Sequence, residues 1–283
     1  MTPSTGATVA ERPLADPGGA SGQPLPGAPS GGAGSGGALL RWSDAIVPLA
    51  CLAVIGAEIL YLRSRELDFI ERETLDPSRL IDHTIDHIRI SAVITVLVMA
   101  VAVPLGILVT RQATQWMAPF VLGLGNIGQA APTVGLLAVV GSFQIGFWPV
   151  VLVLTAYAVL AVLRNTIVGL QQVDRGVLDA ARGMGMSPSG RLFRVELPLA
   201  VPVIAAGART ALVLAVATVP LGANLNAGGL GFELFGAIKT SRPVALFAIS
   251  LFIAVLALLV DWGGGLLQRA FTPRGIRLNA DRV

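Results

Sequence analysis

The sequence contains only one cysteine and one lysine among its 283 residues. Because a single thiol cannot form an intramolecular disulfide, Cys51 provides no disulfide framework and does not indicate a redox compartment. The lysine, Lys239, follows Ile238 rather than a glycine. A nucleotide-binding loop requires the sequence Gly-Lys-Ser/Thr to cradle phosphates, so this chain cannot supply such a loop.

Charged residues are also scarce, at 13% of the chain, whereas a typical soluble domain has about 25%. Hydrophobic residues make up 54% of the chain, and the mean hydropathy is +0.74. This balance predicts a protein that lies in a lipid bilayer. The chain has no Gly-x-Ser-x-Gly sequence, no metalloprotease helix, and no arginine stripe interleaved with aromatic residues. We therefore expect neither an enzyme nor a nucleic-acid-binding protein.

Long apolar runs recur along the chain, and about 20 such residues are enough to cross a hydrocarbon core roughly 30 Å thick. Because lipid offers no hydrogen bonds to the backbone, such long runs are expected to be helical. The sequence therefore predicts an all-α, polytopic integral membrane bundle of about six transmembrane helices. The predicted spans are Ile46–Leu62, Ile90–Val109, Met117–Val140, Trp148–Leu163, Leu199–Leu221 and Val244–Leu267.

Composition divides the chain into four predicted parts. Residues 1–38 consist mainly of Gly, Pro, Ala and Ser and are expected to form a disordered tail. Residues 39–83 would contain the first transmembrane helix and an extracytoplasmic connection. Residues 84–268 would form the main transmembrane domain, and residues 269–283 a cytoplasmic tail.

The placement of arginines predicts the orientation, because cytoplasmic loops of membrane proteins are enriched in Lys and Arg. The connection between the fourth and fifth predicted spans holds five arginines, whereas the turn at residues 141–146 holds none. With six spans, a cytoplasmic fourth-to-fifth connection places both termini in the cytoplasm. The connection after the first span does not fit this pattern, since it also holds four arginines.

The segment from Ile81 to Ile88 alternates isoleucines and polar residues in the pattern of an amphipathic helix that enters the membrane. His83 and His87 share one face of such a helix. Two histidines at this spacing can contribute to a zinc site, but no third ligand is assured. We therefore favour a solvated interfacial face without metal.

A polar, arginine-bearing stretch from Arg164 to Pro198 interrupts the apolar sequence and is expected to lie outside the bilayer. Its residues predict two short helices with a bend between them. Gly183 and Gly185 permit a turn, and Ser187-Pro188 is typical of a helix cap followed by the first helical residue. The small residues of this stretch leave a surface for another protein, although a solvated loop without a partner remains an alternative.

Within this stretch, Asp179-Ala180-Ala181, Gly185, Val195 and Leu197-Pro198 resemble, in residue type and spacing, the EAA motif of ABC importer permeases. In that family, with its type I transmembrane domain, the motif forms a cytoplasmic coupling helix that docks on a separate ATPase subunit. The resemblance implies this role for a coupling loop at residues 165–198, although the family usually has Glu where Asp179 stands. The residues expected to form the coupling site are Asp174, Asp179, Ala180, Ala181, Gly183, Gly185, Met186, Val195, Leu197 and Pro198.

The resemblance extends from about residue 86 to residue 275 and favours the glycine betaine, carnitine and choline branch, with a departure at Leu221–Asn226. It implies a permease in the bacterial plasma membrane that imports one of these osmolytes or a proline-like solute. The implied partners are an ATPase subunit that uses ATP, an extracytoplasmic solute-binding protein, and a second permease, identical or paralogous. No cofactor is expected on this chain itself. The segments that carry the branch resemblance are Val103–Leu108, Arg164–Thr166, Ala180–Met186, Val195–Ala200 and Ala227–Gly231.

Polar residues inside spans are costly in hydrocarbon and often mark a transport pathway. Asn126 and Gln129 share one face of the third predicted span, and Pro132 frees a backbone carbonyl one turn earlier. We expect these residues, together with Asn224 and Asn226, to line the pathway. Hydrogen bonding that merely holds helices together is the alternative.

Three charged residues, Glu58, Arg209 and Asp261, also fall within predicted spans and are expected to pair inside the bundle or to extend toward the interface. Two other kinds of membrane protein stay open. An ion-coupled secondary transporter often contains a repeated half, which this sequence lacks. A non-transporting scaffold would leave the spacing of the polar loop unexplained.

Overall fold

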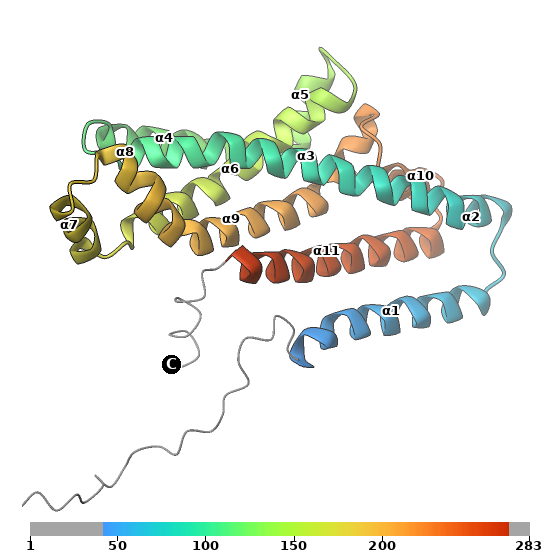
Figure 1. The fold of residues 1–283 in the computed structure, drawn as a ribbon. Coiled ribbons are helices and arrows are strands. Elements are labelled where there is room, and N and C mark those ends of the chain that lie inside the picture. Colours follow the sequence, from blue (N-terminus) through green and yellow to red (C-terminus); the bar gives the residue numbers. More distant parts are fainter. Residues whose placement is uncertain (1–41, 272–283) are drawn as a thin grey trace, which may run out of the picture. The chain divides into compact units, whose positions relative to one another are not determined.

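A computed structural model describes residues 42–271 and shows a bundle of helices without strands in that range (Figure 1). The all-α prediction is therefore confirmed. The predicted tail at residues 1–38 and most of the predicted segment 269–283 lie outside the described residues. The elements are η1 (Trp42–Ala45), α1 (Ile46–Arg63), α2 (Phe69–Thr74), α3 (Pro77–Thr110), η2 (Gln115–Met117), α4 (Ala118–Ala130), α5 (Thr133–Gly141), α6 (Phe147–Gln171), α7 (Arg175–Gly183), α8 (Pro188–Arg191), η3 (Leu192–Glu196), α9 (Leu197–Thr218), η4 (Val219–Leu225), α10 (Gly231–Lys239) and α11 (Pro243–Phe271).

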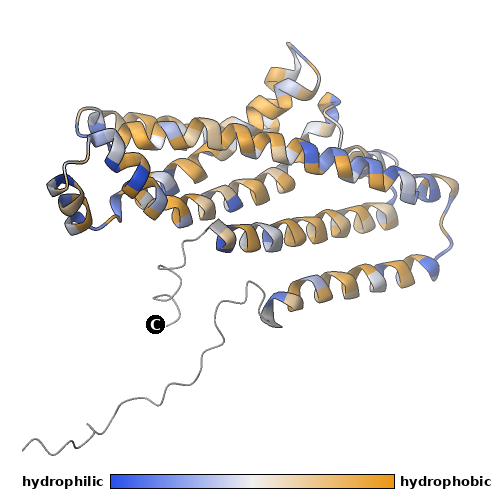
Figure 2. Ribbon diagram, viewed as in Figure 1, coloured by the Kyte–Doolittle hydropathy of each residue, from blue (hydrophilic) through white to orange (hydrophobic). Residues whose placement is uncertain are grey.

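Five helical segments of the described chain are long and apolar enough to cross a membrane. They are α1, α3, α6, α11 and the run that contains α9. Figure 2 shows apolar residues along most of their length. Helices α4 and α5 together would make a sixth span, which agrees with the prediction of about six transmembrane segments.

The third predicted span, residues 117–140, is wrong as one continuous helix. Helices α4 and α5 meet at an angle of 85°, and the break falls at Ala131 and Pro132. Ala131 has an extended backbone with ψ of 135°, as expected for a residue that precedes proline, because the proline ring disfavours the helical conformation there. The break leaves non-helical backbone within an apolar part of the chain.

Two helices are longer than predicted because polar residues near their ends remain helical. Helix α3 has 34 residues and is about 51 Å long, so it exceeds a hydrocarbon core of roughly 30 Å. The predicted amphipathic segment 81–88 forms its first turns. Helix α6 continues to Gln171, so the predicted coupling loop at 165–198 begins too early, and Arg164 lies in the helix rather than in a loop.

Helix α6 is central, and glycines bring its neighbours close to it. A Cβ atom on Gly106 of α3 would lie 2.6 Å from Cγ2 of Thr166, and one on Gly207 of α9 would lie 2.7 Å from Cβ of Asn165. On α4, a Cβ atom on Gly125 would lie 2.9 Å from Cδ1 of Leu160. Because these distances exclude a methyl group without movement, glycine permits the close approach of three helices to α6.

Helix α1 lies along α11 at the edge of the bundle (Figure 1). Tyr61 and Phe247 meet edge to face with ring centroids 6.5 Å apart. At the other end of α1, Trp262 donates from Nε1 to the carbonyl oxygen of Asp44 at 2.7 Å. Cys51 is 3% exposed, so it is a buried thiol in this contact region, as expected for a cysteine within an apolar helix.

Candidate functional site

The segment between α6 and α9 forms two short helices with a bend, as predicted. The side chain of Asp174 caps α7 by accepting a hydrogen bond from the amide of Val177 at 3.2 Å. Gly185 ends this helical turn with φ of +78°, a conformation that side chains rarely adopt. Ser187 then caps α8 by accepting from the amide of Gly190 at 3.2 Å, and Pro188 is its first residue. We call residues 172–198 the coupling segment.

Most of the predicted coupling residues are accessible on this segment. Asp179 and Ala180 are exposed on α7, while Ala181 faces inward and is buried. Asp179 pairs with Arg182 of the same helix at 3.1 Å. Because both side chains are exposed, this pair adds little stability and leaves the carboxylate accessible. Exposed positions are Asp174, Asp179, Ala180, Gly183, Gly185 and Pro198, whereas Met186, Val195 and Leu197 are half-buried.

Large apolar side chains stand in solvent beside these residues. Met184 is 70% exposed and Phe193 is 66% exposed, and both line a pocket of about 700 Å³ formed by residues 184–194. The polar residues Ser187, Ser189 and Arg194 also line this hollow. Exposed apolar side chains rimmed by polar residues are typical of protein contact sites. The coupling segment thus presents a hollow surface at one end of the bundle that has the chemistry of a docking site.

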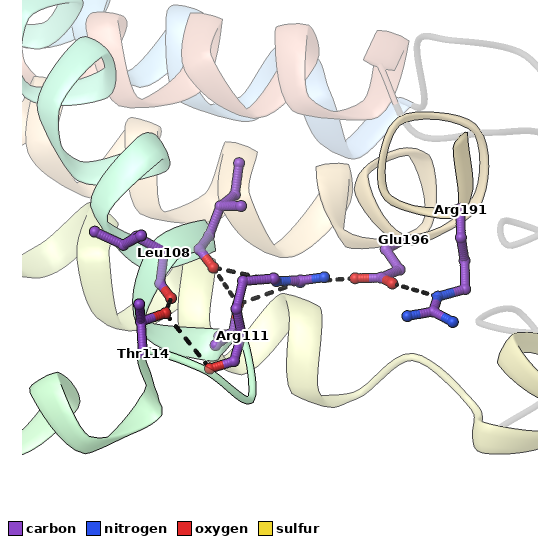
Figure 3. Close-up of polar contacts among 7 residues, drawn as sticks. Leu108, Arg111, Thr114, Arg191 and Glu196 are labelled. Atoms are coloured by element: carbon purple, nitrogen blue, oxygen red, sulfur yellow. Dashed lines mark hydrogen bonds and ion pairs between the residues drawn. The ribbon is translucent and has the colours of Figure 1, made fainter. Parts of the chain in front are cut away.

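Glu196 joins the coupling segment to the transmembrane helices. Its carboxylate accepts a hydrogen bond from Nη2 of Arg111 at 2.7 Å and another from Nε of Arg191 at 2.9 Å (Figure 3). Glu196 is 4% exposed, and such charge-assisted hydrogen bonds are about twice as strong as neutral ones. Arg111 is the C-terminal cap of α3 and also donates to the carbonyl oxygen of Ile107 at 3.3 Å.

The sequence prediction named Val195 and Leu197 but did not assign a role to Glu196 between them. The sequence feature that could have indicated this role is an acidic residue directly before the apolar run of the fifth span, with arginines close to it in the sequence. In the structure, this residue connects η3 to the end of α3 through Arg111, and the chain continues from η3 directly into α9.

The predicted pathway residues Asn126 and Gln129 lie on α4, close to its break at Pro132. Asn126 is exposed, and its Oδ1 accepts a hydrogen bond from Nη2 of Arg164 on α6 at 2.5 Å. Gln129 is half-buried, and no hydrogen bond from its side chain to another described residue occurs. The two amides and the broken backbone therefore share one region of the bundle, together with an arginine that the sequence had placed in a loop.

Asn224 and Asn226 lie elsewhere, at the end of the bundle opposite the coupling segment. Both are exposed, and Asn226 has φ of 56° where it ends η4. No hydrogen bond among the described residues joins them to Asn126 or Gln129. The five predicted pathway residues thus form two groups rather than one.

The expectation of a solvated histidine face is wrong for His87, which is 0% exposed. Its Nε2 lies 2.9 Å from the carbonyl oxygen of Val216 on the run containing α9. A carbonyl only accepts, so Nε2 carries the proton. The isoleucines of the predicted amphipathic segment, Ile81, Ile85 and Ile88, are exposed instead. Hydropathy alone predicts that polar side chains are exposed. Here the buried His87 ring is accommodated because it makes a hydrogen bond to another helix.

His83 contacts α10 at the same end of the bundle. Its Nε2 lies 3.3 Å from Oε1 of Glu233, and its ring stacks on Phe232 with centroids 5.7 Å apart. Burial raises the pKa of the Glu233 carboxyl, and the charges of His83 and Arg79 offset only part of this effect. The described residues contain no group of three or more His, Cys, Asp or Glu that could hold a metal ion.

Of the three charged residues predicted within spans, two pair with each other. Arg209 of α9 donates from Nε and Nη2 to the two carboxylate oxygens of Asp261 on α11, at 2.6 and 2.5 Å. The Arg209 side chain lies against two glycines of α11: a Cβ atom on Gly264 would lie 3.2 Å from its Cγ, and one on Gly265 would lie 3.0 Å from its Nη1. Glu58 of α1 has no such partner among the described residues. The paired charges neutralise each other between α9 and α11, where both side chains are partly exposed.

Comparison with known proteins identifies the family of this chain. Residues 102–273 match the family described as "Binding-protein-dependent transport system inner membrane component". The carnitine transport permease protein OpuCB of Listeria monocytogenes is 36% identical over 199 residues, covering 70% of this chain and 90% of the relative. The choline transport system permease protein OpuBB of Bacillus subtilis is 34% identical over 199 residues, covering 70% and 91%.

A further relative, the osmoprotectant import permease protein OsmW of Salmonella typhimurium, is 36% identical over 200 residues, covering 69% of this chain and 92% of the relative. Among solved structures, the MetNI methionine ABC transporter in an inward facing conformation matches with a TM-score of 0.62 and 23% identity. The match covers 69% of this chain and 97% of the transporter chain. At this identity, the match shows the shared fold alone.

Proposed function

The chain belongs to the family of binding-protein-dependent transport system inner membrane components, and from this we propose that it is the permease of an ATP-driven importer for small quaternary ammonium osmolytes. The substrate class follows the relatives, whose names specify carnitine, choline and osmoprotectants. Glycine betaine, carnitine and choline are the solutes to test first. The chain itself would bind no cofactor, and ATP would be used by a partner subunit.

The coupling segment carries this proposal. Its accessible small residues and its exposed Met184 and Phe193 form a surface suited to a docking partner, and we assign this surface to a separate ATPase subunit. Glu196 would then transmit movement of the partner to α3 through Arg111, across a contact of 2.7 Å. In this scheme ATP hydrolysis drives alternating access, in which the pathway opens to one side of the membrane at a time.

The pathway is proposed to run beside α4 and α6, between this chain and a second permease that is identical or paralogous. Asn126, Gln129 and the break at Pro132 would line its inner half, because broken helices in membrane proteins are tolerated where they line a water-filled cavity. Asn224 and Asn226 would lie near its opposite mouth. In this proposal, the coupling segment and both termini would lie in the cytoplasm.

A solute-binding protein would deliver the osmolyte from outside. Quaternary ammonium groups are usually recognised by aromatic cages, but this chain has only 16 aromatic residues, and the four aromatic contact pairs of the described residues are scattered over the bundle. We therefore assign the selective cage to the binding protein rather than to the permease.

Reconstitution tests the proposal directly. The chain is expressed with a candidate ATPase and binding protein, purified as a complex, and placed in liposomes. We expect ATP-dependent accumulation of radiolabelled glycine betaine that requires all components. Accumulation by this chain alone, driven by an ion gradient, would instead support a secondary transporter, and a complex that binds no ATPase would contradict the proposal.

A further inference from the structure

The charge of Arg164 is not neutralised by any described residue. Arg164 is exposed on α6, seven residues before that helix ends at Gln171, which corresponds to about 10 Å along its axis. Its Nη2 donates to Oδ1 of Asn126 at 2.5 Å. No carboxylate of residues 42–271 lies within 4.0 Å of its guanidinium, so the side chain is held in place by a neutral partner.

Other arginines near the membrane helices are paired differently. Arg209 is neutralised by both oxygens of Asp261, and Arg111 lies 2.7 Å from the carboxylate of Glu196. A guanidinium carries five N–H donors, and Arg164 uses one of them on Asn126. It therefore combines a full positive charge with several donors that are not used within the described chain.

Such a residue is not expected to face hydrocarbon. Charged side chains within membrane helices almost always face the bundle interior or a water-filled cavity and often mark a substrate path. Arg164 lies on the part of α6 next to Asn126, and Asn126 is close along α4 to Gln129 and the break at Pro132. The local arrangement therefore places the unpaired charge on the same surface as the proposed pathway residues.

We propose that Arg164, positioned by Asn126, is a charge-selective element of the pathway that favours osmolytes carrying a carboxylate beside the quaternary ammonium group. This inference rests on the proposed function. A fixed positive charge in a pore raises the barrier for cations. A zwitterion such as glycine betaine has a carboxylate that accepts the unused N–H donors of the guanidinium, whereas choline carries a positive charge and offers only a hydroxyl group.

The test compares uptake of glycine betaine and choline by the complete reconstituted importer, with one preparation of binding protein for all variants. Arg164→Gln removes the charge. Asn126→Asp retains the shape of the partner and places a carboxylate beside the guanidinium, so it neutralises the charge without removing Arg164. Arg164→Lys retains the charge, and Arg63→Gln, on the exposed end of α1, is the matched control.

We expect the ratio of choline uptake to glycine betaine uptake to rise about tenfold in Arg164→Gln and in Asn126→Asp, because each removes an unscreened charge from a pathway with low dielectric walls. Arg164→Lys and Arg63→Gln should retain the ratio of the unmodified chain. An unchanged ratio in both neutralising variants overturns the proposal. An equal loss of uptake for both solutes also overturns it, because that result indicates a structural role.

A defect in assembly of the complex can be distinguished from a change in solute selectivity. If Arg164→Gln does not assemble with its partners, the ratio in Asn126→Asp decides the question. If the unmodified complex shows no ATP-dependent uptake of either solute, the proposed function itself fails, and the charge-selective role fails with it.

Discussion

Arg111 and Glu196 are 85 residues apart in the sequence, yet Nη2 of Arg111 donates to Oε2 of Glu196 at 2.7 Å. Arg111 is the C-terminal cap of α3, and Glu196 is the last residue of η3, directly before α9 (Figure 3). Removal of a buried carboxylate leaves the charges of both arginines without a partner. The free-energy cost of this loss exceeds the net stabilisation that the ion pair provides. This contact therefore offers a direct measure of how firmly the coupling segment is attached.

The first prediction concerns Glu196→Gln. We expect this change to lower the free energy of unfolding by roughly 2–3 kcal/mol, less than for a fully buried pair because Arg111 is partly exposed. It should also reduce solute uptake per ATP hydrolysed. The thermal midpoint of the purified chain and the uptake of the reconstituted complex are the measurements. Glu66→Gln, on an exposed residue, is the control, and equal behaviour of the two variants would contradict the prediction.

The second prediction concerns Gly185, whose φ of +78° lies in the left-handed region. A leucine there is strained by about 1–2 kcal/mol and adds a bulky side chain to the coupling segment. We expect Gly185→Leu to reduce ATPase binding and uptake severalfold while the chain remains inserted. Gly56→Leu on α1 is the matched control, because a Cβ atom at either position meets open space. Unchanged uptake in Gly185→Leu would refute the assigned role of the segment.

The third prediction concerns close packing around α6. A methyl group on Gly106 would lie 2.6 Å from Cγ2 of Thr166, whereas one on Gly123 would meet no atom within 4 Å. We expect Gly106→Ala to lower the free energy of unfolding by about 1–3 kcal/mol through overpacking. Gly123→Ala should be neutral or slightly stabilising, since alanine is the better helix former. Denaturant titration of the two variants in detergent compares them, and equal stability would show that α3 can move away from α6 without cost.

The fourth prediction concerns pH. Burial raises the pKa of Glu233 in the folded chain above its ordinary value, so the folded state binds the proton more tightly than the unfolded state. The resulting stability is fully present below the ordinary pKa and is lost as pH rises through the raised pKa. Glu233→Gln removes this dependence. The thermal midpoint of the variant, relative to the unmodified chain, should therefore increase from acidic to neutral pH.

The control for this titration is Glu66→Gln, because Glu66 is exposed in the connection after α1. Its midpoint should follow that of the unmodified chain at every pH. A Glu233→Gln midpoint that differs from the unmodified chain by a constant amount would contradict the prediction, since a constant difference carries no proton linkage.

The coupling segment was predictable because its structure is set by local chemistry. Asp174 and Ser187 are helix-capping residues, Pro188 fits the first turn of a helix, and Gly185 suits a positive φ. Each of these preferences acts within about four residues. The bend between α7 and α8 therefore follows from the sequence, and the structure places the Ser187 cap as predicted, with Asp174 as a second cap that the prediction did not name.

The ends of α6 and the environment of His87 were not predictable in the same way. A prediction from hydropathy ends a span at the first polar residues. In the structure, however, Thr166 and Ile167 are buried, and α6 continues to Gln171. His87 is buried because a carbonyl of another helix accepts its hydrogen bond. Both outcomes depend on contacts between residues far apart in the chain, which composition and periodicity do not report.

The break between α4 and α5 illustrates a third limit. Pro132 indicated a disturbance of the helix, but a proline inside a span permits either a mild kink or a complete break. The angle of 85° depends on how α5 packs beyond the break. One such contact is at Gly141, where a Cβ atom would lie 2.3 Å from Leu225. The sequence thus marked Pro132 as a disturbance but predicted one continuous span rather than a break of 85°.

The burial of Cys51 in α1 has a practical consequence for labelling. It is the only thiol of the chain, and an enclosed thiol reacts slowly with maleimides because the reagent must reach the sulfur. A cysteine introduced on the exposed face of α7 would then be the single rapidly labelled site. Fluorescent or spin probes can follow the motion of that helix during turnover without first constructing a cysteine-free background.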